Sequence, residues 1–216
     1  MEKSTNGAAM AVWVTSHLMS VRGDVWPAEQ DGGAYRWEGR AADGAWLATA
    51  HGRWLRLAPL VRGDGFPIVA RPTLRTFPAV APGTDLVARG TATGVLLSAV
   101  LHRDEAPPEL CFRVTLPAGL VLEPMPSGAL DVVDDFTGAT VGRFPRPWTC
   151  DAMYRPVGAL YMLDGPVVTL RLDLADVAFP MVALLRYTAV TGRPLPVVPP
   201  KMEAHRHELE YAGSPN

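Results

Sequence analysis

Residues 85–182 alternate short runs rich in β-forming residues with clusters of turn-forming residues. In the run 110–116, apolar and polar side chains also alternate one by one. A period of two places Phe112 and Val114 on one face of a strand and Arg113 on the other. This pattern predicts strands with one face in a core and one face in water.

The remaining runs of this stretch have the same length and are mostly closed by Gly, Pro or Asp. Strands this short, recurring every ~8–12 residues, are typical of antiparallel sandwiches and barrels. No run has the length and 3.6-residue period of a crossover helix, which argues against a parallel sheet. We therefore predict an all-β, antiparallel β-sandwich of one large or two small lobes, with its core on the side of Val168, Leu170 and Leu172 in the last run. The runs are residues 85–89, 95–102, 120–122, 129–133, 139–144, 157–163 and 167–174.

Turn chemistry and composition suggest three regions along the chain. We predict an N-terminal β-rich region over 1–72, a β-sandwich domain over 73–186 and a Pro-rich, polar C-terminal tail over 187–216. The proline-rich stretch 194–200 is expected to form an extended arm that lies along a neighbour. The 21 prolines and 20 glycines fit a fold with many turns. Candidate strands of the first region are residues 10–15, 34–37, 45–48, 53–57 and 67–70.

Charge argues against a nucleic-acid partner. The 20 Lys and Arg residues are nearly balanced by 22 Asp and Glu residues, and no basic stripe would neutralise phosphates. The apolar stretch 8–14 is shorter than the ~20 residues of a membrane span, and no signal peptide is recognisable. We expect no membrane span, and these features leave the cellular location open.

Two short features have more than one interpretation. Cys111 and Cys150 permit a disulfide if their Cα atoms lie within ~7 Å, but two unpaired buried thiols are the favoured interpretation. The pattern V-R-G-D-x-aromatic-P occurs at 21–27 and again at 61–67. We interpret it as a Gly-Asp turn, with adhesion through Arg-Gly-Asp as the alternative.

No set of residues predicts catalysis or metal binding. The chain has neither the G-x-S-x-G of a nucleophile elbow nor the H-E-x-x-H of a zinc protease. The cluster of His205, His207 and neighbouring glutamates is expected to be a solvated tail. Asp131 and Asp134 are expected in an Asp-rich hairpin turn rather than a Ca²⁺ site. We therefore expect no enzymatic activity, no cofactor and no metal.

Aromatic residues gather in the first quarter of the chain and are the remaining candidates for a binding site. Tyr35, Trp37, Trp46 and Trp54 could stack on sugar rings if one face displayed them. The favoured interpretation is core packing, because each ring buries a large apolar area. Trp54 alternates with Arg53 and Leu55, as expected for a half-buried strand.

Several short motifs, in the same order, resemble a β-rich segment of large bacterial secreted and wall-associated proteins. Those proteins include RHS-repeat toxins and actinobacterial proteins with disaggregatase-type repeats. The matching stretches are a "DG-x-W" opening at 43–46, "P-G-x-D-L" at 82–86, "T-x-x-G-V" at 91–95, "L-P-x-G-L" at 116–120, "V-x-D-x-x-G" with one extra residue at 132–138, "I-P-x-P-x-x-x-D-A" at 144–152 and "A-x-Y-P-V-V" at 177–182.

This resemblance implies a scaffolding β-sandwich without catalytic residues, at the cell surface or secreted. The chain departs from the family by lacking RHS repeats and by passing into a proline-rich tail. We predict a non-catalytic structural or protein-interaction module of a larger surface, toxin-associated or particle assembly, with a protein partner or self-association. The alternative is a carbohydrate-binding module that uses the N-terminal tryptophans.

Overall fold

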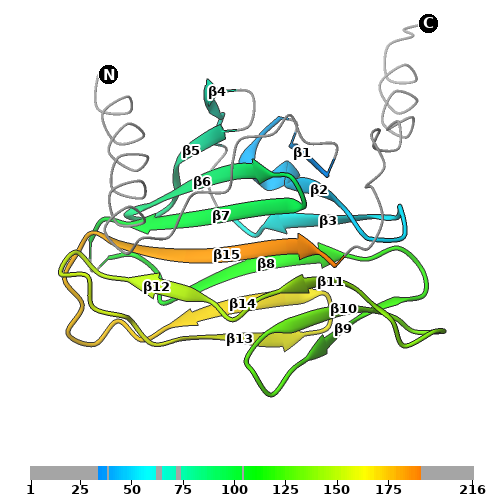
Figure 1. Cartoon of the computed structure of the whole chain (residues 1–216). Helices are drawn as coiled ribbons and strands as arrows, with labels where there is room; N and C mark the ends of the chain where they lie inside the picture. The colour runs from blue at the N-terminus through cyan, green and yellow to red at the C-terminus, as the bar shows by residue number, and fades with distance from the viewer. Residues whose placement is uncertain (1–33, 38, 62–64, 72–73, 104, 191–216) are drawn as a thin grey trace, which may run out of the picture.

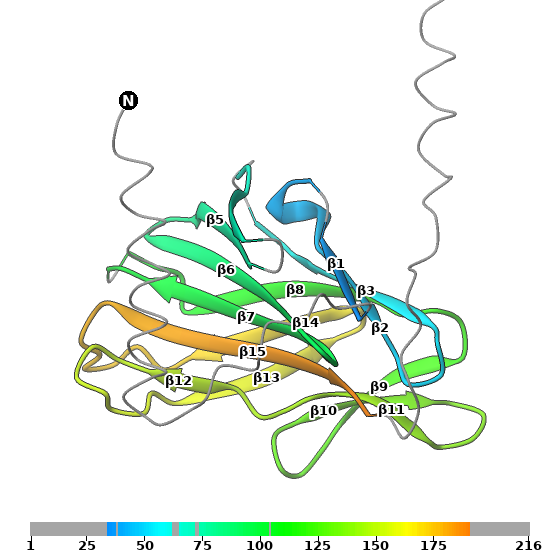
Figure 2. The ribbon, with the colours of Figure 1, turned by 45° about the horizontal axis from the view of Figure 1, so that its top comes forward.

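The computed structural model describes residues 34–190 except 38, 62–64, 72–73 and 104. Within this part of the chain, two antiparallel sheets pack face to face as a β-sandwich (Figures 1 and 2). The predicted all-β class and sandwich architecture are confirmed. The predicted strand at 10–15, the turn at 21–27 and the arm at 194–200 lie outside the described residues.

The first sheet has the strand order β1-β2-β3-β8-β14-β13. The sheet therefore combines three early strands with three that come much later in the chain. A short 3-10 helix, η1 (Ala41–Asp43), connects the first two strands. The strands are β1 (Tyr35–Trp37), β2 (Ala45–Ala48), β3 (Trp54–Pro59), β8 (Glu109–Thr115), β14 (Val167–Leu172) and β13 (Ala159–Asp164).

The second sheet has the order β4-β5-β6-β7-β15-β11-β10-β9, and β12 pairs with β15 beside this path. Two hairpins, β5-β6 and β6-β7, build one half of it, and β15 joins them to the other half. The strands are β4 (Ile68–Arg71), β5 (Leu74–Ala81), β6 (Thr84–Thr91), β7 (Gly94–Leu101), β15 (Met181–Ala189), β11 (Thr140–Phe144), β10 (Leu130–Asp134), β9 (Leu120–Pro124) and β12 (Trp148–Cys150).

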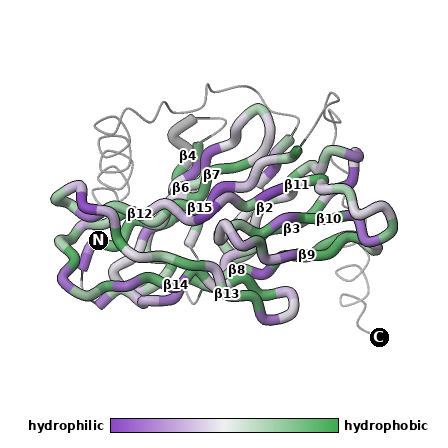
Figure 3. The backbone as a smooth tube through the Cα atoms, turned by 60° about the horizontal axis from the view of Figure 1, so that its bottom comes forward, coloured by the Kyte–Doolittle hydropathy of each residue, from purple (hydrophilic) through white to green (hydrophobic). Residues whose placement is uncertain are grey.

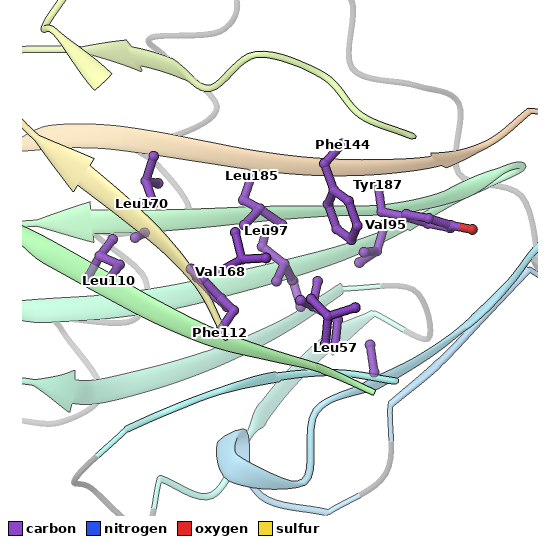
Figure 4. Close-up of a cluster of buried hydrophobic side chains, with 14 of the residues drawn as sticks. Leu57, Val95, Leu97, Leu110, Phe112, Phe144, Val168, Leu170, Leu185 and Tyr187 are labelled. Carbon is purple, nitrogen blue, oxygen red and sulfur yellow. The ribbon is translucent and has the colours of Figure 1, made fainter. Parts of the chain in front are cut away.

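The core lies between the two sheets and is made by alternate residues of each strand. Phe112 and Val114 are 3% and 2% exposed, whereas Arg113 between them is exposed. Leu170 on β14 is 1% exposed. Side chains of β8 and β14 point toward Leu185 and its neighbours on the opposite sheet (Figure 4), and hydropathy alternates along several strands (Figure 3). The predicted strand faces are therefore confirmed.

Two predicted boundaries need correction. Strand β3 pairs with β8, with Leu57 opposite Val114, and both residues belong to one core cluster. The boundary predicted at residue 72 therefore does not separate two cores. Strand β15 continues to Ala189, past the predicted start of the tail at 187, because its last residues still pair with β7. Strands β5 and β12 were not among the predicted strands.

Tyr187 connects the two sheets near the end of β15. Its ring is fully buried, and its centroid lies 5.1 Å from that of Phe144 (Figure 4). Its hydroxyl donates a hydrogen bond to the carbonyl oxygen of Ala48 in the first sheet, at 3.2 Å. Glycines at 94 and 142 leave room for this residue, since a Cβ at either position would collide with it. Burial raises the pKa of the Tyr187 hydroxyl.

Candidate functional site

A cavity of about 400 Å³ lies between the two sheets at one end of the sandwich. The start of β8 forms one wall, and β5, β6 and β7 form the other. The exit from β3 and the β7–β8 connection surround its opening, where Leu60 and Glu105 are exposed. The lining residues are Pro59, Leu60, Val61, Val80, Ala81, Pro82, Thr84, Leu86, Ala99, Glu105, Pro107, Glu109, Leu110, Cys111 and Phe112.

The cavity exists because a small residue occupies an inward position of β7. The inward residues Leu97 and Leu101 of this strand fill the core on either side of Ala99. Ala99 is itself paired with Leu86 on β6 and with another alanine, Ala183, on β15. Ala99 reaches less far toward β8 than a leucine would, so space remains above it.

Two of the described residues that line the cavity are charged, and both are carboxylates. Glu109 at the start of β8 accepts two hydrogen bonds on its Oε1, from Nε and Nη2 of Arg171 at 2.9 and 2.6 Å. Glu105 lies in the β7–β8 connection and is exposed. Among the described residues, Glu105 has no ion pair. The cavity is therefore apolar inside and has acidic residues at its rim.

A second hollow adjoins the cavity and shares Thr84 and Glu105 with it. Its main polar feature is the pair formed by Asp85 and His102. Asp85 is buried, its Oδ1 accepts the N–H of Ala79 at 2.8 Å, and its Oδ2 lies 3.0 Å from Nε2 of His102. The lining residues are Ala79, Gly83, Thr84, Asp85, His102, Arg103, Glu105 and Pro180.

Sequence reasoning missed the pair of Asp85 and His102, although a signal for it was present. The β6–β7 hairpin pairs Thr84 with Leu101, and the N–H of His102 donates to the Gly83 carbonyl oxygen at 2.8 Å. A turn placed at residues 91–94 fixes this register and brings the open ends of the hairpin together. The hairpin register would therefore have predicted the contact.

In this pair, His102 could act as a base and Asp85 as the carboxylate that orients it. Catalysis by such a pair would also need a nucleophile beside it. The hydroxyl of Thr84 donates to the carbonyl oxygen of Pro82 at 3.1 Å. No serine, cysteine or lysine is among the described residues that line this hollow. Nor do the described residues contain a group of three or more His, Cys, Asp or Glu side chains arranged to hold a metal. The predicted cluster at 203–208 lies outside the described part.

Two of the four predicted aromatic contact residues lie in or against the core. Trp37 is 1% exposed, its Nε1 donates to the carbonyl oxygen of Arg40 at 3.1 Å, and its ring centroid is 4.7 Å from that of Phe77. Tyr35 is half-buried, and its ring packs against Gly90 of the second sheet. For Trp37 the structure agrees with the favoured interpretation, core packing, because its ring fills the space between the sheets.

Trp46 and Trp54 lie together on the outer face of the first sheet, and both are half-buried. Trp46 is opposite Arg56 on β3 and opposite Arg36 on β1. Trp54 is opposite Ala48, so the two indoles are diagonal neighbours across β2 and β3. The predicted aromatic group is thus reduced to two rings flanked by arginines.

The acidic residues near 131–135 have structural roles. Asp134 accepts the N–H groups of Phe136 and Thr137 at 3.2 and 3.0 Å, which fits the predicted Asp-rich hairpin turn. Asp131 is buried in β10 instead, and its carboxylate binds Nε and Nη2 of Arg143 at 2.6 and 2.7 Å. The hydrogen bond from Arg143 lowers the pKa of Asp131.

The pair of Asp131 and Arg143 predicts a dependence of stability on pH. Because the pKa of Asp131 is lower in the folded state than its unfolded value of 3.8, its contribution is complete above that value and is lost as pH falls through the folded pKa. The free energy of unfolding is therefore expected to fall steeply below about pH 4. Arg143→Gln should make this decline shallower and lower stability at neutral pH. Chemical denaturation over a pH series measures both.

Arg113→Gln is the control for this pH series, because Arg113 is exposed on the outer face of β8, which belongs to the other sheet from β10. It should leave the acid decline unchanged. An identical decline in wild type and Arg143→Gln would contradict the role given to this ion pair.

No disulfide joins the two cysteines. Cys111 is in β8 of the first sheet, where its Sγ lies 3.5 Å from the hydroxyl of Thr169, and Cys150 is buried in β12 beside the second sheet.

In the part of the chain that the structure describes, no helix is long and apolar enough to cross a membrane.

The described residues form an all-β antiparallel sandwich with an apolar cavity at one end. Comparison with protein-family models, with curated proteins and with solved structures gives no match. Inference about function therefore depends on the surfaces and cavities of the chain itself.

Proposed function

We propose that this protein is a non-catalytic β-sandwich module that self-associates through strand β13 and so contributes to a larger assembly. The observation that carries the proposal is the largely apolar edge that β13 presents at the end of the first sheet (Figure 1). The resemblance to surface and secreted scaffolding segments supports a location at the cell surface or outside the cell.

The backbone of β13 has one side toward β14 and one side toward the edge of the sheet. The N–H of Asp173 donates to the Gly158 carbonyl oxygen at 2.8 Å. Every second residue counted from Gly158, such as Leu160 and Met162, therefore directs its backbone N–H and C=O toward β14. The alternate residues Ala159, Tyr161 and Leu163 direct their N–H and C=O groups away from it. A second strand can bind there.

The side chains on the outer face of this edge are apolar and exposed. Leu160 is 51% exposed and Met162 is 37% exposed. Strand β13 carries no charge before Asp164 and contains no proline. Two of the other sheet edges carry features that oppose pairing. Strand β1 has only three residues, including an arginine, and β9 ends in Glu-Pro.

A two-fold axis through Tyr161 would pair β13 with the same strand of a second copy. In this antiparallel register, Tyr161 pairs with Tyr161 of the second copy, and Ala159 pairs with Leu163 of the second copy. The outward N–H and C=O groups of all three residues then form hydrogen bonds across the seam. Leu160 then lies opposite Met162 of the second copy. The exposed apolar side chains would cover one another across the seam.

The absence of catalysis is part of the same proposal. The pair of Asp85 and His102 could position a proton, but the described residues of its hollow include no serine, cysteine or lysine, and the Thr84 hydroxyl donates to the carbonyl oxygen of Pro82. A buried Asp bonded to a backbone N–H and a histidine also serves to fix the β5–β6 turn. The hydrogen bond from the Ala79 N–H to Asp85 fits this structural role.

Carbohydrate binding is the second candidate function, and the outer face of β2 and β3 favours it. Trp46 and Trp54 are diagonal neighbours there, with Arg36 and Arg56 on either side of Trp46. Indole rings can stack on sugar rings, and arginines can donate to sugar hydroxyls. Both rings are half-buried, so the surface that they offer is smaller than the sequence suggested.

Charging the β13 edge is expected to separate the dimer into monomers. In a Leu160→Lys, Met162→Lys double variant, two like charges of one chain would face two of the other across the seam. Sedimentation velocity and light scattering of the full chain should give a dimeric mass for the wild type and a monomeric mass for the variant. Circular dichroism should be the same for both, because both side chains are exposed.

Phe136→Lys with Met153→Lys is the matched control, since it adds the same charge at positions that are 96% and 68% exposed and lie outside β13. The control should remain dimeric. A β13 variant that keeps the dimeric mass would rule out this edge as the interface. A monomeric wild type whose tryptophan fluorescence changes with soluble oligosaccharides would favour the glycan function.

A further inference from the structure

We propose that the cavity between β8 and the β6–β7 hairpin binds a small amphipathic amine. The apolar body of the ligand would lie between the sheets, and its ammonium group would sit at the rim beside Glu105 and Glu109. This site uses no residue of the β13 edge, so it is independent of the self-association proposed above.

The inner walls of the cavity suit an aliphatic chain or a single ring. Leu86 and Ala99 line it from the second sheet, and Leu110 and Phe112 line it from the first. All four are at least nine-tenths buried. A volume of about 400 Å³ is within the range of small-molecule sites in proteins. Apolar atoms placed there would leave water without forcing the core side chains apart.

The rim selects the charge of the ligand. Among the described residues that line the cavity, Glu105 and Glu109 are the acidic ones and none is arginine, lysine or histidine. His102 and Arg103 line the adjoining hollow instead. Arg171 donates two hydrogen bonds to Oε1 of Glu109, through Nε and Nη2. Glu105 has no ion pair within the described part of the chain, so its carboxylate is available to an incoming cation. An ammonium group would gain charge-assisted hydrogen bonds here, and a carboxylate would be repelled.

Three probes with the same six-carbon body separate the apolar contribution from the charge. The probes are hexylamine, 1-hexanol and hexanoate, each titrated into the ¹⁵N-labelled full chain at neutral pH. Hexylammonium is expected to bind roughly tenfold more tightly than hexanol, the scale of one charge-assisted contact. Hexanoate should bind more weakly than hexanol. The amide resonances that shift should include those of Ala99, Leu110 and Phe112.

Two variants test the two halves of the site. Glu105→Gln changes an exposed side chain, so it should fold normally, keep hexanol binding and lose most of the preference for the amine. Ala99→Leu would fill the cavity from its floor and should abolish binding of all three probes. Glu123→Gln removes an exposed carboxylate on β9, outside the cavity lining, and should bind the probes as the wild type does.

The outcomes either support or overturn the site. Equal affinities for the three probes, shifts confined to residues outside the lining, or no saturable binding of any probe would each overturn it. An amine preference that persists unchanged in Glu105→Gln would overturn the role of the rim. Because Glu105→Gln does not alter the core, the test stands even if Ala99→Leu does not fold.

Discussion

Phe112→Ala is expected to lower the free energy of unfolding by about 3–5 kcal/mol, because it removes a buried aromatic ring and leaves a hole that the two sheets cannot close. Phe112 is 3% exposed and belongs to the core cluster between the sheets. It also lines the existing cavity, so the hole would join a space that is already open. Urea denaturation at neutral pH measures the loss.

Arg113→Ala is the matched control for this experiment. Arg113 is the next residue along β8, is exposed, and lies on the outer face of the first sheet. Its substitution should cost under ~1 kcal/mol. Similar losses for the two variants would mean that the register of β8 differs by one residue from the structure, because such a shift exchanges the two faces of a strand.

Gly94→Ala is expected to lower the free energy of unfolding by about 3 kcal/mol through a collision with backbone atoms. A Cβ at this position would lie 2.2 Å from the carbonyl oxygen of Tyr187 and 2.9 Å from its carbonyl carbon. These atoms belong to β15, which pairs with β7 at this point, with Thr188 opposite Gly94. Relief would require the central strands of the second sheet to move apart. Thermal and urea denaturation both report the loss.

Gly158→Ala provides the comparison, because its Cβ would meet the Cβ of Asp173 at 3.2 Å and only a small shift would be needed. Neither glycine has a positive φ, so strain in the backbone dihedral does not separate them. We expect a cost under ~1 kcal/mol at Gly158. If Gly94→Ala were as stable as Gly158→Ala, the close approach of β7 and β15 would be contradicted.

Local alternation was enough to predict the strands and their faces over much of the chain. In β8 and β14, apolar residues at every second position identify the core side, because side chains on a strand point alternately to opposite faces. The buried face of a strand was harder to predict where apolar and polar residues do not alternate. Strand β7 is buried at every position, and β5 contains a proline, so their environments do not follow from the pattern of residues.

The candidate sites depended on pairings between distant segments. Burial of Trp37 follows from its contact with Phe77 on the other sheet, which no local pattern indicates. The cavity arises where Ala99 faces the start of β8, and the exposed edge arises because β13 happens to be last in its sheet. The identity and spacing of residues determine which segments form strands and which side of each is apolar, since these are properties of a few neighbouring residues. The order of the strands decides which apolar side becomes core, cavity or edge, because that order brings together residues far apart in the chain.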